Sequence, residues 1–274
     1  MEVTGRTAFI TGAANGIGLG IARAFARAGA KLALADVDEA ALSSARAELA
    51  KETAVESFVL DVRDRAGYAR AADAAEARLG PVSLLFNNAG VAMAVPAEQM
   101  SYESWDFALG VNLGGVVNGL QTFVPRMVAR GRELGGGHIV NTSSGAGLVA
   151  PGSGFLYHTA KYAVVGLSES LGFELAGAGI GVSVLCPGPV ATRIMHHTLR
   201  MQPASAPRPA EQMVATVDSF LNAGASPDAV GEMVLRGVRD GARYIHTDRI
   251  VEAALRARTQ ALLDSFPREV HDSR

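Results

Sequence analysis

Short runs of β-branched and apolar residues alternate with longer helical patterns along most of the chain. This alternation predicts βαβ units that build a doubly wound α/β fold, a parallel sheet of about seven strands with helices on both faces. Right-handed crossovers place every strand end at one edge of the sheet, where such folds bind ligands. The expected strands are residues 7–10, 31–35, 55–60, 83–86, 138–141, 182–185 and 244–246. The expected helices are residues 17–28, 39–51, 65–79, 102–128, 157–176, 228–239 and a last one ending near 263.

Size and composition limit the function further. The chain has 274 residues, 49% of them hydrophobic, which fits one domain over residues 1–274 with a large core. A formal charge of −2 and the lack of a basic run argue against nucleic acid as a partner. The single cysteine excludes an internal disulfide and a cysteine-cluster metal site, and we expect no metal. Without a signal-peptide pattern or an apolar run approaching membrane-spanning length, we expect a soluble, cytoplasmic protein with no membrane partner.

Residues 193–225 depart from the alternating pattern. They follow a strand end, where a lid over a substrate site would lie, and they are rich in proline, methionine and small residues. Methionine side chains adapt to irregular shapes, so a lid of this kind suits a large apolar substrate, although a plain surface excursion fits the same composition. The residues concerned are Met195, Met201, Pro203, Pro207, Pro209 and Met213.

The first expected strand runs into the glycine-rich sequence TGAANGIG, which leads directly into a helix. Gly12 permits a tight turn, Gly16 lets the backbone approach a pyrophosphate, and Gly18 allows close packing of helix and strand. The helix N-terminus then offers free N–H groups and a positive dipole end to phosphates. Many α/β proteins use such turns structurally, but this position favours a dinucleotide. Further contacts are expected from the turn residues Asn15 and Ile17.

The second expected strand ends in Asp36. A carboxylate at this place accepts hydrogen bonds from the hydroxyls of an adenosine ribose and repels a 2′-phosphate. NADP would favour an arginine or lysine nearby, whereas the candidate positions hold Asn15 and Val37. We therefore expect NAD as the cofactor. The alternative is a strand-end acid that is merely solvated.

Other strand ends carry residues that suit the same ligand. An aspartate after the third strand could meet the adenine amino group, and small residues after the fourth let backbone pass close to the cofactor. The sequence NNAG is, by itself, equally consistent with a strand-terminating turn. A Pro-Gly pair ends the sixth strand, and a threonine beyond it is placed to touch a carboxamide. The residues expected at these ends are Asp61, Val62, Asn88, Ala89, Gly90, Pro187, Gly188, Val190 and Thr192.

Tyr157 and Lys161 stand four residues apart in an expected helix and therefore share one face. Tyrosine has an ordinary pKa of about 10, and a positive charge nearby would favour the phenolate and lower that pKa. A serine hydroxyl close to the pair, such as Ser144, could hold a carbonyl or alcohol oxygen. The pair is thus suited to moving a proton on and off a substrate oxygen. An isolated Tyr-x-x-x-Lys is more often an exposed helix pair.

With these motifs in place, the chain resembles the short-chain dehydrogenase/reductase family in its ordinary, shorter form. TGxxxGxG, NNAG, a strand ending in NTSS, YxxxK and PG occur in family order. The resemblance implies a Rossmann-type fold and a catalytic tetrad. Tyr157 matches the proton donor and acceptor, and Lys161 the residue that lowers its pKa and binds the nicotinamide ribose. Ser144 matches the serine that polarises the substrate oxygen, and Asn112 the asparagine that anchors a water-linked proton relay.

Several other residues near these motifs are candidates for the same roles or for contact with substrate. Ser143 competes with Ser144, but strand alternation points it to the opposite face. Asn118 lies outside the VNLGG motif that contains Asn112. His158 is expected to pack or to be solvated, Cys186 to be a buried small hydrophobe, and the lid residues His196 and His197 to be solvated or to contact substrate.

A finer resemblance concerns the substrate. The lid, the sequence RYIHT and the sequence ALLDSFP are similar to bacterial dehydrogenases that oxidise benzylic alcohols in aryl ethers. Steroids, terpenoids, cyclic alcohols and polyketide intermediates would fit a methionine-bearing lid equally well. We expect an NAD-dependent oxidoreductase that moves a hydride between the cofactor and a bulky apolar or aromatic secondary alcohol or ketone. The alternatives are an NADPH-dependent carbonyl reductase and a non-catalytic dinucleotide sensor. The resemblance further implies a homotetramer, or a homodimer, formed through the long helices that carry Asn112 and Tyr157.

Overall fold

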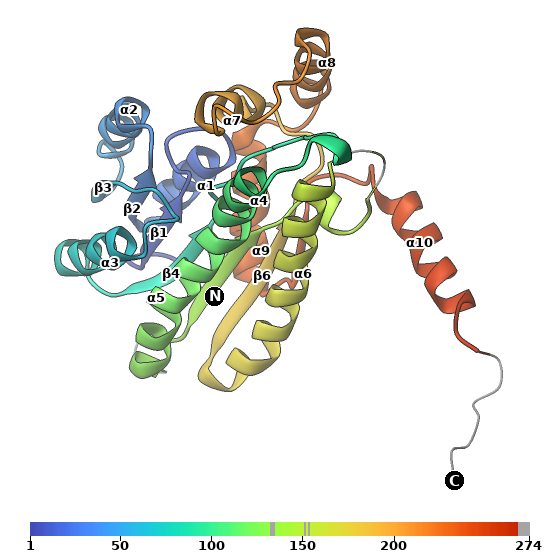
Figure 1. The fold of residues 1–274 in the computed structure, drawn as a ribbon. Coiled ribbons are helices and arrows are strands. Elements are labelled where there is room, and N and C mark those ends of the chain that lie inside the picture. The colour runs from blue at the N-terminus through green and yellow to red at the C-terminus, as the bar shows by residue number, and fades with distance from the viewer. Residues whose placement is uncertain (132–134, 151, 153, 268–274) are drawn as a thin grey trace.

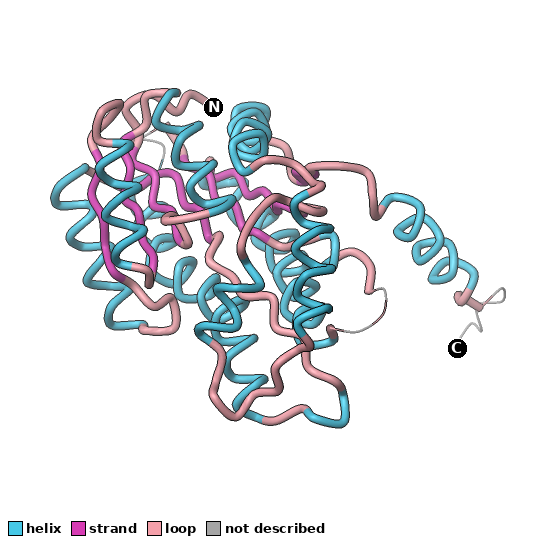
Figure 2. The backbone as a smooth tube through the Cα atoms, turned by 90° about the horizontal axis from the view of Figure 1, so that it is seen from above, coloured by secondary structure: helices cyan, strands magenta, loops and turns pink. Residues whose placement is uncertain are grey.

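A computed structural model describes residues 1–131, 135–150, 152 and 154–267. The strands are β1 (Thr7–Thr11), β2 (Lys31–Asp36), β3 (Val55–Val59), β4 (Val82–Asn87), β5 (Gly137–Thr142), β6 (Ile180–Cys186) and β7 (Tyr244–His246). They form one parallel sheet in the order β3-β2-β1-β4-β5-β6-β7, with helices on both faces (Figure 1 and Figure 2). The predicted doubly wound α/β fold is confirmed. The strand order reverses between β1 and β4, which is the point where such sheets bind ligands.

The predicted helices are present with small shifts at their ends, and two further helices lie within residues 193–225, where none was predicted. They are α1 (Gly16–Arg27), α2 (Glu39–Leu49), α3 (Arg65–Leu79), α4 (Tyr102–Leu109), α5 (Gly115–Arg130), α6 (Phe155–Leu175), α7 (Ile194–Met201), α8 (Glu211–Asn222), α9 (Pro227–Asp240) and α10 (Glu252–Asp264). One turn of π-helix, Gly110–Gly114, joins α4 to α5.

Strand β1 shows how the sheet divides the core in two. Successive side chains of a strand point to opposite faces. Ile10 accordingly packs with apolar residues of α1, α2 and α9, whereas Phe9 packs with those of α3, α5 and α6. Both side chains are fully buried. Burial on both faces explains why the strands of this sheet are continuous apolar runs.

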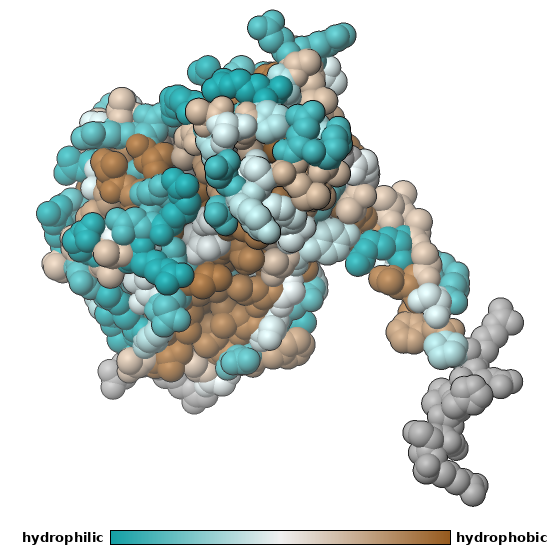
Figure 3. All heavy atoms as spheres, in the orientation of Figure 1, coloured by the Kyte–Doolittle hydropathy of each residue, from teal (hydrophilic) through white to brown (hydrophobic). Residues whose placement is uncertain are grey.

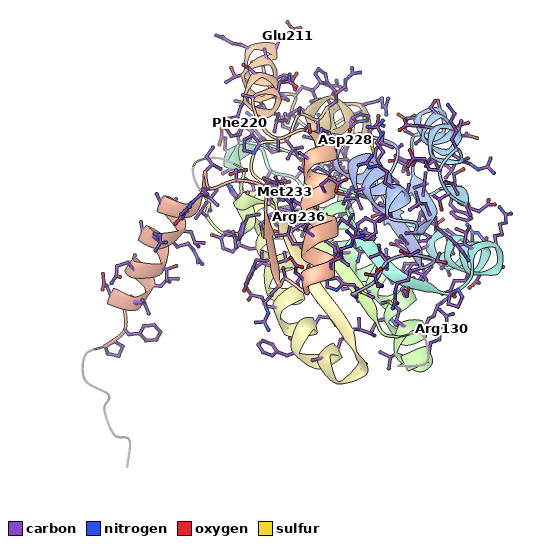
Figure 4. The ribbon with its side chains drawn as sticks, turned by 180° about the vertical axis from the view of Figure 1, so that it is seen from behind. Arg130, Glu211, Phe220, Asp228, Met233 and Arg236 are labelled. Carbon is purple, nitrogen blue, oxygen red and sulfur yellow. The ribbon has the colours of Figure 1, made fainter. Side chains whose placement is uncertain are left out.

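Helices α1 and α9 cross at backbone distance behind the sheet, where Figure 4 shows α9 with Asp228 near its start. A Cβ atom on Gly20 would lie 2.0 Å from the Pro227 oxygen, and one on Gly231 would lie 2.1 Å from the Gly20 oxygen. Only glycine permits this approach. Because α9 directly follows residues 193–225, the crossing fixes the point at which that segment returns to the body of the protein.

The expectation that no apolar run approaches membrane-spanning length was wrong. Residues Tyr102–Arg130 form a continuous helical stretch of 29 residues that is long and apolar enough to cross a membrane, by length and composition alone. Of its most apolar window, 44% is buried inside the protein. Phe107, Val111 and Phe123 belong to the core beside the sheet, so the hydropathy of this helix serves packing within the fold.

Two parts of the chain extend away from the sheet. Residues 193–225 contain α7 and α8, which Figure 1 shows above the carboxyl ends of the strands. Helix α10 leaves the body sideways, as Figure 1 and Figure 4 both show. The residues at the start of the α10 region, Ile250 and Val251, line the cavity described next.

Candidate active site

A cavity of about 430 Å³ opens at the carboxyl edge of the sheet, over the ends of β1, β2, β4, β5 and β6. The lining includes Ser144, Tyr157 and Lys161 together with the predicted cofactor residues Gly12, Asn15, Gly16, Ile17, Asp36, Asp61, Val62, Asn88, Ala89, Gly90, Pro187, Gly188, Val190 and Thr192. Two predicted residues, Gly18 and Asn112, lie behind the wall instead. Residues scattered over the sequence therefore meet at one site because parallel strands end at one edge.

The glycine-rich turn after β1 is shaped as the sequence predicts. Gly12 has a φ of +65° and Gly16 a φ of +54°, a left-handed region in which glycine is favoured. A Cβ on Gly18 would lie 2.0 Å from the Gly12 oxygen, so Gly18 closes the turn from behind. Residue Asn15 stands at the N-terminus of α1 without a side-chain cap, which leaves the first N–H groups of that helix to an anion.

Asp36 is held in a fixed orientation at the end of β2. Its Oδ2 accepts from Ala14 N and its Oδ1 from Asp38 N, each at 3.0 Å. Each carboxylate oxygen can accept a second hydrogen bond, so both remain able to receive a ribose hydroxyl. The donors at the turn and this oriented acceptor fit a dinucleotide.

Asp61, the carboxylate predicted for the adenine, has a partner that the sequence did not reveal. Arg63 Nη2 donates to Asp61 Oδ2 at 2.6 Å, and this contact holds the pKa of the Asp61 carboxyl below its ordinary value. The next residue, Val62, packs against the backbone of Gly115, where a Cβ would lie 2.6 Å from Val62 Cγ2. The chain just after β3 thus packs against the start of helix α5.

Lys161 is 3% exposed, and its Nζ donates to Thr142 O at 3.0 Å. Burial lowers the pKa of its ammonium to about 8. The same Nζ lies 5.5 Å from the centre of the Tyr157 ring, in a cation–π arrangement. Lys161 is therefore positioned over the tyrosine ring by a strand-end carbonyl.

The net shift of the Tyr157 pKa differs from the expectation. Burial raises the pKa of the phenol, and a hydrogen bond with Ser144 opposes that rise. The rise caused by burial is the larger effect, so the net shift is upward although the Lys161 ammonium lies near the ring. A raised pKa keeps the phenol protonated, so phenolate formation needs further positive charge near the hydroxyl.

The two adjacent serines point to opposite sides, as strand alternation predicts. Ser144 Oγ accepts from Ala146 N at 3.1 Å and lies in the cavity beside Tyr157. Ser143 Oγ donates to Lys161 O at 2.7 Å and is 2% exposed, so it fastens the helix that carries the lysine.

Asn112 stands in the π-turn between α4 and α5, a distortion that often marks functional sites. Its Nδ2 donates to Val91 O at 2.9 Å and to Ala108 O at 3.0 Å, while Oδ1 accepts from Val91 N at 3.1 Å. The amide thereby fixes the loop after β4. A Cβ on Gly90 would lie 2.9 Å from Asn112 Oδ1 and 3.5 Å from Lys161 Nζ, so the asparagine and the lysine are separated only by this glycine. Asn118, outside the motif, instead donates to Val62 O at 2.8 Å.

Several residues of the segment 193–225 enter the site although the sequence did not single them out. Arg193, Ile194 and Arg200 line the cavity together with His197, for which substrate contact was one alternative. His196 faces α8 instead, where its Nε2 lies 2.6 Å from Asp218 Oδ2. Their proximity to the sheet depends on the path of residues 193–225, which has no local sequence signal.

The remaining candidates have structural surroundings. Cys186 is 2% exposed, and burial raises the pKa of its thiol to about 12, which suits the predicted small hydrophobe. Burial lowers the pKa of His158, which lies outside the cavity lining. Within the described part of the chain, no group of three His, Cys, Asp or Glu residues is arranged to hold a metal ion.

A family model described as short chain dehydrogenase matches residues 6–203. The chain belongs to the short-chain dehydrogenase family. As a member it is an NAD(P)-dependent oxidoreductase of CH–OH groups, and the resemblance inferred from TGxxxGxG, NNAG and YxxxK is confirmed.

Relatives and solved structures match nearly the whole chain. The C alpha-dehydrogenase of Sphingobium sp. (strain NBRC 103272 / SYK-6) is 41% identical over 266 residues, which cover 95% of this chain and 86% of that protein. A short-chain dehydrogenase structure from Novosphingobium aromaticivorans has 40% identity and a TM-score of 0.83, covering 99% of this chain and 91% of the other. A short-chain dehydrogenase/reductase from Burkholderia phymatum in complex with NAD has 34% identity and a TM-score of 0.87, covering 98% of this chain and 99% of the other.

Proposed function

We propose that this short-chain dehydrogenase uses NAD to oxidise a bulky apolar or aromatic secondary alcohol to its ketone. One observation carries the proposal: a single cavity brings together Ser144, Tyr157 and Lys161, the oriented carboxylate of Asp36, and an apolar wall. The three side chains handle a substrate oxygen, the Asp36 carboxylate receives a ribose, and the apolar wall excludes water from the reacting atoms.

Tyr157 is the general base for alcohol oxidation in this proposal. Ser144 donates to the substrate oxygen and orients the hydroxyl toward the phenol, which takes its proton as hydride leaves the carbon. Because burial raises the Tyr157 pKa, the site must stabilise the phenolate, and the Lys161 ammonium at 5.5 Å from the ring centre supplies positive charge. The nicotinamide, when bound, accepts the hydride and adds its own positive charge.

Asn112 acts in this proposal by holding the loop after β4 in place through its side-chain amide. Its amide N–H groups are both used on Val91 and Ala108, and its oxygen receives Val91 N. These bonds leave no free N–H on the amide for a proton relay from Lys161. The amide keeps the π-turn and the cofactor loop after β4 in register.

NAD is the proposed cofactor because Asp36 ends β2 and the positions that would accommodate a 2′-phosphate, Asn15 and Val37, are uncharged. Asp36 is fixed by two backbone donors, so its negative charge stays where a ribose 2′-oxygen would lie. An NAD enzyme of this kind works in the direction of oxidation where NAD pools are kept oxidised.

The proposed substrate class follows from the lid side of the cavity. The wall there consists of aliphatic, thioether and aromatic side chains, which favour a large apolar alcohol. The name of the Sphingobium relative, C alpha-dehydrogenase, is compatible with a benzylic carbon as the site of oxidation. The apolar residues of this wall are Met195, Met201, Val217, Phe220, Leu221 and Val251.

We further propose a cytoplasmic homotetramer, or a homodimer, assembled through α5 and α6. Val117, Val128 and Phe173 are 44%, 43% and 68% exposed on these two helices. Figure 3 shows a hydrophobic area over the lower part of both. Large exposed apolar patches are typical of protein interfaces. Light scattering on the purified protein would measure the assembly, and a monomer would contradict this part.

The activity is tested with purified protein, a panel of apolar and aromatic secondary alcohols, and NAD or NADP. Reduced cofactor is followed by absorbance, and NADH binding is titrated separately by fluorescence. Turnover with NAD that exceeds turnover with NADP supports the proposal. Tight NADH binding without turnover of any alcohol or ketone would support a sensor instead, and a preference for NADPH with ketones would support a carbonyl reductase.

A further inference from the structure

Helix α7 crosses the cofactor cleft and is fastened on both sides of it. On one side Thr198 Oγ1 accepts from Ala92 N at 2.8 Å, just beyond the end of β4. On the other side Arg200 Nη2 donates to Asp38 Oδ2 at 2.8 Å, just beyond the end of β2. Because β1 lies between β2 and β4, α7 passes over the glycine-rich turn that follows β1. A Cβ on Gly16 in that turn would lie 3.1 Å from Thr192 Cγ2, so the chain leading to α7 already covers it.

Asp38 holds the Arg200 side of α7 with a carboxylate whose own position is fixed. Its Oδ1 accepts from Ala41 N at 3.2 Å and caps α2, while Oδ2 receives Arg200. The side chain of Asp38 is 20% exposed and that of Arg200 is 60% exposed. The carboxylate is therefore fixed by its helix, whereas the guanidinium has room to exchange partners.

Both groups lie at the adenosine end of the proposed cofactor site. Asp36, Asp38 and Arg200 line the same cavity, and Asp36 Oδ1 accepts from the backbone N of Asp38. His197 stands beside them, with its Nδ1 3.3 Å from Arg200 Nη2. Burial lowers the pKa of His197, and the two carboxylates oppose that shift, which places its ring within electrostatic reach of both.

The charges at this end decide how a 2′-phosphate would be received. Asp36 and Asp38 together carry two negative charges, and Arg200 carries one positive charge that Asp38 already engages. A phosphate arriving here would meet both carboxylates, while Arg200 is engaged by Asp38 and the second lining arginine, Arg193, acts on His197. A guanidinium without a carboxylate partner is, by contrast, well suited to bind phosphate through two parallel N–H···O bonds.

We propose that Asp38 is a second determinant of cofactor choice, because it engages a lid arginine that would otherwise bind the 2′-phosphate of NADP. The inference rests on the proposed NAD preference and adds to it a residue pair joined across the cleft by the lid. Asp36 excludes the phosphate directly. Asp38 excludes it by occupying Arg200, and the same ion pair helps to hold α7 over the dinucleotide.

The test uses Asp38→Asn in the full-length protein. Asparagine keeps the oxygen that caps α2 but loses the charge that engages Arg200. Kd values for NADH and NADPH are measured by fluorescence titration, and kcat/KM values with NAD and NADP by absorbance. Asp38→Asn should shift the Kd ratio toward NADPH by roughly tenfold, the size of one charge-assisted hydrogen bond.

Two further variants isolate the role of Arg200. Arg200→Gln should shift the ratio the opposite way, since it leaves both carboxylates without a positive partner. In the double variant Asp38→Asn/Arg200→Gln, the Kd ratio should not show the shift toward NADPH that Asp38→Asn alone produces. Glu39→Gln removes an exposed negative charge from the next position, outside the cavity lining, and should leave the ratio unchanged.

The results distinguish a failure of this inference from a failure of the proposed function. If Asp38→Asn and Glu39→Gln shift the ratio equally, or if the double variant keeps the full gain, then Arg200 does not select the cofactor and the inference is overturned. A wild-type protein that binds neither NADH nor NADPH would contradict the proposed function. A wild type that binds both, with a ratio insensitive to Asp38, would contradict this inference alone.

Discussion

Replacing Lys161 with methionine should separate the stability of this protein from its activity. Lys161 is 3% exposed, and burial lowers the pKa of its ammonium from 10.5 to about 8. At about 1.4 kcal/mol for each tenfold change in an acid constant, the charged group costs the fold on the order of 3 kcal/mol at pH 7. The folded pKa lies below the unfolded one, so this cost is fully present at neutral pH and disappears as the pH rises from about 8 toward 10.5.

Methionine removes that cost and also removes the hydrogen bond to Thr142 O at 3.0 Å. Loss of a charge-assisted bond to a buried carbonyl costs about 1–3 kcal/mol, so the two effects nearly cancel. We expect Lys161→Met to be between equally stable and about 2 kcal/mol more stable than wild type at pH 7, with that advantage lost near pH 10. Turnover should fall at least about 100-fold, because the positive charge beside Tyr157 is gone.

Urea unfolding at pH 7 and pH 10, at one protein concentration, measures the stability, and initial rates with NAD and a turned-over alcohol measure the activity. Lys31→Met is a matched control, since Lys31 Nζ also donates to a backbone oxygen, that of Leu79 at 3.1 Å, but outside the cavity lining. That variant should keep its turnover. A Lys161→Met protein that is clearly less stable at both pH values, or that keeps its activity, would refute the reasoning.

Three further predictions concern the turn, the core and the ribose site. Gly18→Ala should weaken NADH binding at least tenfold in a fluorescence titration, because its Cβ would lie 2.0 Å from the Gly12 oxygen; unchanged binding would mean that the turn can move. Burial lowers the pKa of His138 to about 4, so folding holds this histidine neutral, and stability should fall as pH drops from 6.5 toward 4, by roughly 3 kcal/mol. His138→Gln should flatten that slope in urea unfolding, and an equally steep slope would show that other groups cause it. Asp36→Ala should reduce the preference for NAD over NADP in kcat/KM, and an unchanged ratio would remove Asp36 as the ribose acceptor.

Local patterns were sufficient for most of the fold. Apolar strand runs and glycine-rich turns depend on neighbours in sequence, so β1 and the turn around Gly12 lie where they were predicted. Strand-end motifs such as NNAG and PG meet in one cavity because parallel topology brings them to one edge. Alternation predicts that Ser144 and Ser143 point in different directions, and their hydroxyls do have different partners, Ala146 N and Lys161 O.

Contacts between distant segments could not be predicted in this way. The Arg200–Asp38 pair joins residues 162 positions apart, and its formation depends on the path of residues 193–225 over the sheet. The direction of the Tyr157 pKa shift was also missed, because sequence spacing shows that Lys161 is near but not that the phenol is buried. A helix was predicted over residues 102–128, but its apolar character was underestimated, since its apolar residues are spread along the helix rather than gathered in one run.

The central claim is that Tyr157 moves the proton while NAD takes the hydride. Its most direct test is single-turnover oxidation of a substrate alcohol by Tyr157→Phe, beside an NADH titration of the same variant. Loss of the phenol should slow NADH formation by roughly 100-fold to 10,000-fold, the usual contribution of a general base, while the NADH Kd changes little. NADH formation at the wild-type rate in a variant that binds NADH normally would contradict the account.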